Sequence, residues 1–424
     1  MTRDEALALD AQDPLAPLRE QFVLPPGVIY LDGNSLGVLP RTTAARVQQV
    51  VTQEWGVDLI RSWNSAGWID LPQRVGDKIA RLVGAAPGEL VVADSTSVNL
   101  FKVLSAALTI TAIDAPQRKT ILSERSNFPT DLYIAEALCR ERGLALQLAE
   151  PDELPGLLNE HTAVLMLTHV NYRSGRMHDM AALTAAGHQA GALTVWDLAH
   201  SAGAVPVDLQ GANADFAIGC GYKYLNGSPG APAFVWAHPR HASRFWQPLA
   251  GWMGHAAPFQ FTPGYKPAEG ISRYLCGTPA VLSLAALECG VDTVLAAEAY
   301  GGMPALRRKS LALTRLFAAQ VQAHCPQLLL VSPSEDAARG SQVCLAHAEI
   351  GYPVIQALIS RGVIGDFRAG DKSHAAGAMD ILRFGFTPLY LRYADAWDAA
   401  EHLRQVLHSG EWQRPEFNRR HAVT

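Results

Sequence analysis

The chain has 424 residues, of which 49% are hydrophobic and 18% charged, so it can bury a large core and form two or three domains. Its net charge of −5, without runs of Lys or Arg, argues against an electrostatic nucleic-acid binder. The first twenty residues carry acids where a signal peptide would be apolar, and the apolar runs are too short to span a bilayer. The six cysteines are scattered, which favours reduced thiols over disulfides or a zinc site, so we expect a cytoplasmic protein.

Residues 1 to about 50 are expected to form an N-terminal arm with a turn. Within it, GNSLG (33–37) matches the G-x-S-x-G elbow of serine hydrolases, and VIYLD before it resembles a strand. An elbow needs a helix directly after its serine, whereas Pro40 interrupts here. The elbow also normally follows several strands of the sheet, and only about thirty residues precede this one. We therefore disfavour a serine hydrolase.

From about residue 85 to 240, short apolar runs alternate with stretches of helical spacing. The predicted strands are ELVVAD, KTILSE, TAVLMLT, LTVWD, DFAIGC and APAFVWA. The predicted helices are STSVNLFKVLSAALTI, PTDLYIAEALCRERG and MHDMAALTAAGHQAG. Continuous apolar strands separated by helices predict an α/β fold with a mostly parallel sheet covered on both faces. We assign residues 51–295 to this large domain.

After about residue 300 the pattern changes. A long helical stretch, MPALRRKSLALTRLFAAQVQAHC, leads into the short strands LLLVS, SQVCLAH and ILRFGF and a last helix. We assign residues 296–424 to a smaller C-terminal α+β domain.

Polar residues follow directly after most of the predicted strands of the large domain. Ligands bind at the carboxyl ends of the strands in such a sheet, so these residues are the candidate site. They are Asp94 to Ser97, Ser126 to Phe128, Thr168, Asp197 to His200, and Gly219 to Lys223.

Asp197 and Lys223 are the pair that indicates a particular chemistry. Pyridoxal phosphate needs a lysine to form an imine and a buried carboxylate to keep its ring nitrogen protonated. The glycines around Lys223 would let the backbone approach a small cofactor closely. Either residue alone would more often be a capping aspartate or a solvated lysine.

Three further motifs fit the same cofactor. Thr96 and Ser97 open a helix after a strand, which is typical of an N-cap but also of a phosphate site. Phe128, in SNFPTD, either belongs to a turn before a helix or stacks on a planar ring. His200 lies three residues after Asp197, where it is either a core histidine or a neighbour of the cofactor.

The motifs taken together resemble the kynureninase family, in its bacterial type. YLDGNSLG, SWNSAGWID, DSTSVN, SNFPTD, LTHVNYRSG, WDLAHSAGA, GCGYKYLNGSPG, GWMGH and FTPGY occur in the family's order, over about residues 28–400. The family comprises pyridoxal-phosphate enzymes of fold type I, in the class V aminotransferase-like group. The resemblance implies hydrolysis of L-kynurenine to anthranilate and L-alanine, in tryptophan degradation, by a homodimer.

The resemblance also implies roles for individual residues. Lys223 would form the imine and move the substrate's α-proton, and Tyr222 would help hold the phosphate and return a proton to the β-carbon. Arg383 would bind the α-carboxylate, and Trp63 would help form an aromatic substrate pocket. The other implied cofactor contacts are Thr96, Ser97, Phe128, Thr168, Asp197 and His200, with Trp252 and Thr278 reaching in from the other subunit.

The sequence leaves open which substrate is preferred and which reaction of this fold is catalysed. Relatives that prefer the ring-hydroxylated substrate carry asparagine where Thr278 stands and histidine near Trp63, so the resemblance favours plain kynurenine. The alternative within the fold is a cysteine desulfurase or another class V lyase. That chemistry needs a nucleophilic cysteine in a loop, whereas Cys325 ends a predicted helix and Cys344 lies inside a predicted strand.

Overall fold

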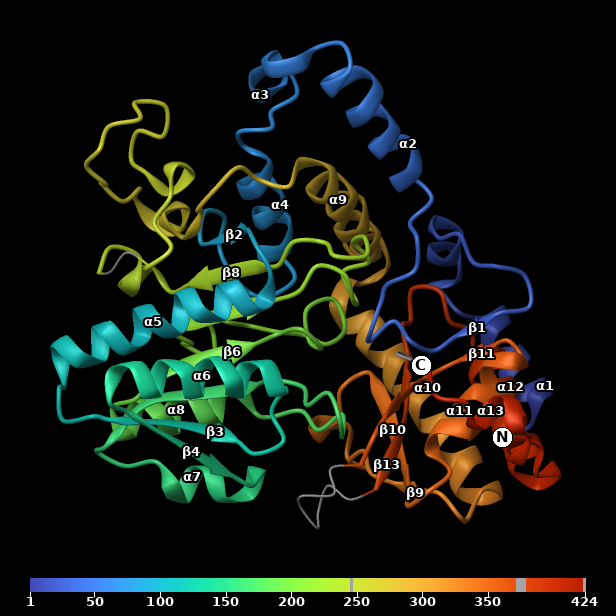
Figure 1. Cartoon of the computed structure of the whole chain (residues 1–424). Helices are drawn as coiled ribbons and strands as arrows, with labels where there is room; N and C mark the ends of the chain where they lie inside the picture. Colours follow the sequence, from blue (N-terminus) through green and yellow to red (C-terminus); the bar gives the residue numbers. More distant parts are fainter. Residues whose placement is uncertain (245–246, 371–378, 422–424) are drawn as a thin grey trace.

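The computed structural model describes residues 1–244, 247–370 and 379–421 of the chain, and its centre is a seven-stranded sheet (Figure 1). The strand order is β2-β8-β7-β6-β5-β3-β4; β8 runs antiparallel to both of its neighbours and all other pairs are parallel. The strands are β2 (Leu90–Val92), β3 (Thr120–Glu124), β4 (Ala145–Ala149), β5 (Thr162–Thr168), β6 (Leu193–Asp197), β7 (Phe216–Gly219) and β8 (Phe234–Ala237). The predicted mostly parallel sheet is confirmed.

Helices cover both faces of this sheet, which explains why its strands are apolar without alternation. On β5, Val164 and Met166 pack into the core under one set of helices, whereas Leu165 and Leu167 pack into the core on the other side. The first set is α5 (Thr96–Asp114) and α6 (Pro129–Arg142); the second is α4 (Leu71–Ala80), α7 (Leu154–Leu157), α8 (Met180–Ala190) and α9 (Val281–Leu295). Among the described helices, α5 alone is long and apolar enough to cross a membrane, but 61% of its apolar window is buried inside the protein, as in a core helix.

A second, smaller antiparallel sheet lies in the C-terminal part of the chain, in the order β12-β13-β10-β9 (Figure 1). Its strands are β9 (Leu329–Leu330), β10 (Gln342–His347), β12 (Asp366–Arg368) and β13 (Asp380–Gly385). The helices of this part are α10 (Gly302–His324), α11 (Gly351–Ser360), α12 (Tyr393–Ser409) and α13 (Pro415–Asn418). The expected small α+β domain therefore has its sheet and helices, while the exact domain boundaries stay a prediction.

The first forty residues pack against this C-terminal part. An ion pair of 2.7 Å joins Arg3 of α1 (Arg3–Ala11) to Asp398 of α12. The short strand β1 (Ile29–Tyr30) pairs in parallel with β11 (Val363–Ile364). Only the segment that follows, with α2 (Thr43–Gln49) and α3 (Ser62–Ser65), extends outward as an arm (Figure 1).

Candidate active site

A pocket opens at the carboxyl ends of β5, β6 and β7, as the sequence predicts. Eight of the twelve predicted site residues line it together: Thr96, Ser97, Phe128, Thr168, Asp197, His200, Tyr222 and Lys223. The other four residues of its lining are Thr130, Asp131, Tyr172 and Ala199. The topology brings them together because parallel strands end at one edge of the sheet.

Lys223 and His200 contact each other inside this pocket. Lys223 Nζ lies 2.9 Å from His200 Nε2. Burial, and then the positive charge of Lys223, lower the pKa of the His200 imidazole well below its usual range. The ring is therefore neutral near pH 7, which allows its Nε2 to accept a hydrogen bond from the Lys223 amine, and both side chains line the pocket.

Two buried carboxylates lie at the floor of the pocket. Asp197 ends β6, and its Oδ1 accepts a 2.8 Å hydrogen bond from the backbone N–H of Ala199. Burial raises the pKa of Asp197 while Lys223 opposes that change. Asp131, in the first turn of α6, has a pKa raised well above its usual range by burial and then by Asp197. Burial therefore favours one shared proton on the two carboxylates. The single negative charge that remains would be neutralised by a positively charged ring nitrogen of a cofactor.

Asn127 holds two of the predicted residues in place. Its Oδ1 accepts hydrogen bonds from the hydroxyl of Thr168 and, at 2.7 Å, from the backbone N–H of Phe128. Phe128 is 40% exposed and meets Tyr172 edge to face, with 5.3 Å between ring centroids. The phenyl ring therefore presents an open apolar wall to the pocket.

The first turn of α5 supplies hydroxyls and a positive dipole end. Ser95 caps the helix by accepting from the N–H of Val98 at 3.3 Å, which leaves the Thr96 and Ser97 side chains facing the pocket. Such a helix start favours a bound phosphate. Beneath it, the fully buried Lys102 bonds the Asp94 carboxylate and the carbonyl of Tyr274 at 2.6 Å, which fixes the turn before the helix.

The two tyrosines beside Lys223 have different surroundings. Tyr222 lines the pocket, and burial raises the pKa of its phenol, so the group is a proton donor near neutral pH. Tyr224 is buried and donates to the carbonyl of Ser341 at 3.2 Å. The loop is close-packed, because a Cβ on Gly37 would lie 2.5 Å from the Lys223 carbonyl oxygen. Glycine is required there by space.

The remaining four predicted residues lie outside this pocket. Arg383, on β13, contacts the pocket lining at Tyr172, to whose carbonyl its Nη1 donates at 3.0 Å. Trp63, on α3 of the arm, packs against Trp252, with 5.8 Å between ring centroids. Thr278 lines a separate hollow that also includes Asp94 and Cys276.

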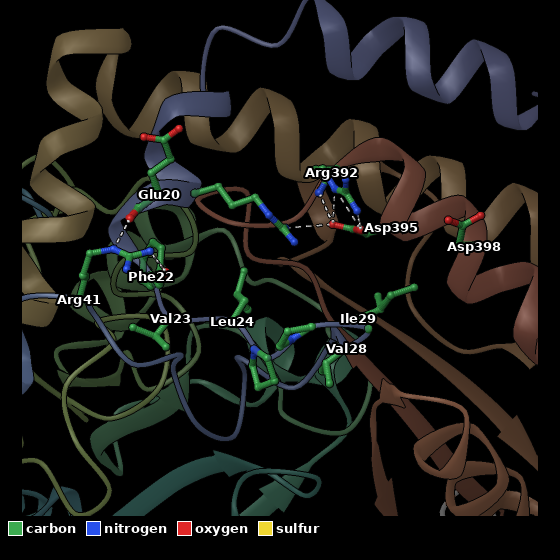
Figure 2. Close-up of a pocket in the computed structure, with 14 residues that line it drawn as sticks. Glu20, Phe22, Val23, Leu24, Val28, Ile29, Arg41, Arg392, Asp395 and Asp398 are labelled. Carbon is green, nitrogen blue, oxygen red and sulfur yellow. Dashed lines mark hydrogen bonds and ion pairs between the residues drawn. The ribbon is translucent and has the colours of Figure 1, made fainter.

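Another hollow, of about 690 Å³, lies between the N-terminal segment and α12 (Figure 2). Its arginines are already paired. Arg41 donates to the carbonyls of Glu20 and Phe22, and Arg392 pairs with Asp395 at 2.6 Å. It contains none of the residues predicted to take part in the reaction.

The residues that line the pocket of Lys223 fit pyridoxal phosphate. Lys223 is available for the aldehyde, Asp197 for the ring nitrogen, Phe128 for a ring face, and the start of α5 for the phosphate. Asp131 Oδ2 is buried without a hydrogen-bond partner, which is consistent with a polar group of a ligand facing this floor. Within the described residues no group of three or more His, Cys, Asp or Glu side chains could hold a metal ion.

Sequence reasoning missed Asp131 and Tyr172. Both belong to motifs that it singled out, SNFPTD and LTHVNYRSG. Asp131 looked like an ordinary acid in the first turn of a helix, where acids are common. Its distance from Asp197 depends on strand order, which no local pattern contains.

Comparisons with known proteins agree with this geometry. Residues 306–403 match the family model described as the kynureninase C-terminal domain. Over 428 aligned residues the chain is 57% identical to kynureninases of Burkholderia pseudomallei (strain 1106a) and Burkholderia mallei (strain SAVP1), and the match covers 100% of each chain. The kynureninase of Pseudomonas fluorescens is 56% identical with the same coverage.

Solved structures share the fold at low sequence identity. A cysteine desulfurase from Thermococcus onnurineus NA1 has a TM-score of 0.78 at 19% identity, and one from Escherichia coli has 0.77 at 20%; each match covers 93% of this chain and 98% of the other. A variant of the cystine C–S lyase C-DES, solved with glycine covalently linked to its pyridoxal phosphate, has 0.76 at 17%, with 91% and 98% covered. This similarity shows the fold type alone.

Proposed function

The chain belongs to the kynureninase family, and from this premise we propose that it hydrolyses L-kynurenine to anthranilate and L-alanine with pyridoxal phosphate as cofactor. The observation that supports the proposal most directly is the meeting of Lys223, Asp197, Phe128 and the α5 N-terminus around one pocket. A cytoplasmic location remains a prediction from composition and cysteine pattern.

The cofactor, when bound, supplies an electron sink for charge that develops on the substrate's carbon atoms. Lys223 holds the aldehyde and then carries the α-proton, and neutral His200 accepts a hydrogen bond from it. Asp197 keeps positive charge on the ring nitrogen. These residues fix where the proton leaves and where negative charge is stabilised.

The hydrolytic step divides one water molecule between the two products. The hydroxyl joins the γ-carbonyl carbon, the Cβ–Cγ bond breaks, and anthranilate leaves as the carboxylic product. The β-carbon then takes a proton, which we assign to the Tyr222 phenol because it lies beside Lys223 and keeps its proton near pH 7. Arg383 is the proposed partner of the α-carboxylate, to which a guanidinium offers two donors.

The positions of the cysteines argue against the alternative of a desulfurase. Cys139, Cys220, Cys325 and Cys344 are buried, and neither Cys276 nor Cys289 lines the pocket of Lys223. Burial raises the pKa of the Cys344 thiol to about 11, so it is a poor nucleophile near neutral pH. No cysteine of the described residues is presented to the cofactor pocket.

The first test is the substrate itself. We expect the cofactor-loaded protein to release fluorescent anthranilate from L-kynurenine, to act more slowly on 3-hydroxykynurenine, and to release no sulfide from cysteine. Thr278 and Trp63 are the proposed sources of the preference, so Thr278→Asn should narrow the difference between the two kynurenines. Sulfide from cysteine without anthranilate from kynurenine would refute the proposed reaction while keeping the fold.

We also propose a homodimer in which Trp252 and Thr278 complete the site of the other subunit. The arm carries exposed apolar side chains, with Trp55 59%, Leu59 57% and Ile60 76% exposed, and such a surface is typical of an interface. Ile60→Asp is therefore expected to weaken the dimer and lower activity in parallel, measured by analytical ultracentrifugation and turnover. Ile113→Asp, 70% exposed at the end of α5, is the matched control. A fully active monomer would contradict the shared site.

A further inference from the structure

Arg383, on β13, is surrounded by polar and charged groups from β12 and from the N-terminal turn. Its side chain is 2% exposed. Its Nη2 bonds the carboxylate of Asp366 on β12 and lies 2.7 Å from the hydroxyl of Ser35 in the N-terminal turn. Ser35 Oγ in turn donates to Asp366 Oδ2 at 2.9 Å, so the guanidinium already has an anionic partner inside the protein.

A second carboxylate, Asp32, lies on the other side of this cluster. The backbone of the N-terminal turn pairs with the strand of Arg383. The Gly385 N–H donates to the Leu31 carbonyl at 2.6 Å, and Asp32 and Gly385 form an isolated parallel β-bridge. Asp32 Oδ1 is buried and has no hydrogen-bond partner. A buried carboxylate oxygen without a donor is costly when ionised and much less so when protonated.

Within the part of the chain that the structure describes, the formal charges of the cluster balance before any substrate is present. Arg368 pairs with Asp366 Oδ1 at 2.7 Å, which gives two guanidiniums against the carboxylates of Asp366 and Asp32. Among the described residues, three tyrosines whose pKa Asp32 affects are neutral: Tyr30 on β1, Tyr224 in the lysine loop and Tyr390 after β13 all have pKa values raised by burial. His200 is also neutral, because burial and the positive charges of Lys223, Arg383 and Arg368 lower its pKa.

We propose that a carboxylate ligand binds at Arg383 together with one proton, and that Asp32 is the group that takes up this proton. The proposal rests on the assignment of Arg383 to the substrate's α-carboxylate. The added anion would leave three negative charges against two positive ones in a buried place, and protonation of Asp32 restores the balance.

Asp32 titrates near neutral pH, where the effect of its proton on binding can be measured. Burial and then the neighbouring Asp366 raise its pKa to about 7, against the opposing effect of Arg383. A third negative charge would raise it further, whereas an ordinary aspartate stays ionised throughout this range. Binding should therefore weaken as the pH rises through 7.

The probe for the test is 4-(2-aminophenyl)-4-oxobutanoate, which keeps the carboxylate and ketone of kynurenine but lacks the amine that would react with the cofactor. We would titrate it into the holoenzyme by calorimetry at pH 7 in phosphate and in Tris, whose ionisation heats differ. We expect an uptake of about half a proton, and a Kd about tenfold weaker at pH 8 than at pH 6. Asp32→Asn should bind with no proton uptake and a Kd that is constant over this range.

The controls test the role of Asp32 separately from the assignment of Arg383 to the substrate's α-carboxylate. Asp395→Asn removes another buried carboxylate, paired with Arg392 and Arg19, and should keep the pH dependence of the wild type. If Arg383→Gln binds the probe as the wild type does, the assignment of the carboxylate site fails. If Arg383→Gln loses binding but Asp32→Asn still takes up the proton, the proton belongs to Lys223 or His200 and the present inference is overturned. If Asp32→Asn does not fold, a wild-type Kd independent of pH overturns it as well.

Discussion

Replacement of Lys223 by alanine is expected to abolish anthranilate release, lowering kcat by roughly 10³–10⁴-fold. Two functions are lost together, because the same amine holds the cofactor aldehyde and moves the α-proton. His200 is not expected to substitute, since its pKa lies well below the usual range and its ring cannot form an imine. The measurement is anthranilate fluorescence in single turnover and at steady state.

A second readout makes this result specific to Lys223. Borohydride should fix the cofactor covalently to the wild type and leave Lys223→Ala unlabelled, whatever the activity. Lys78→Ala is the control; this lysine pairs with Asp292 at 2.8 Å, is not part of the lining of the Lys223 pocket, and should keep both labelling and turnover. Covalent labelling of the Lys223 variant at wild-type yield would assign the imine to another lysine.

The large sheet could be predicted because its strands are buried on both faces. Every residue of Thr162–Thr168 is buried, so the printed sequence shows one continuous apolar run. The edge strand β4 was missed because Ala145–Ala149 is mostly half-buried and contains Gln147. A strand that packs on one side and at the edge leaves little apolar signal in the sequence.

Only the part of the site that lies at strand ends and helix starts could be predicted from the sequence. The eight predicted residues that line this pocket, Lys223 among them, follow strands or begin helices, which is a local pattern. The pairing of Arg383 with Asp366 and Ser35 joins three separate elements, and the packing of Trp63 against Trp252 joins the arm to a distant loop. Such contacts depend on tertiary packing, so no periodicity of the sequence reports them.

The two carboxylates at the pocket floor allow a sharper prediction. Asp197→Asn is expected to lower kcat at least about a hundredfold, because the amide keeps the shape but removes the charge that holds the ring nitrogen protonated. The Ala199 N–H can still donate to the amide oxygen, so the backbone of the loop should not move. The measurement is turnover together with the absorbance spectrum of the bound cofactor.

Asp131→Asn is the matched comparison, since it removes a buried carboxyl from the same floor. Burial and the charge of Asp197 hold the pKa of Asp131 well above its usual range, which favours the neutral, protonated form of this acid. An amide resembles that neutral acid, and a loss below about tenfold is expected. Equal losses in the two variants would show that the negative charge is shared across the pair, in which case Asp197 would not be its sole carrier. The ring nitrogen would then be held by a coupled dyad, and both residues would have to be assigned to the cofactor.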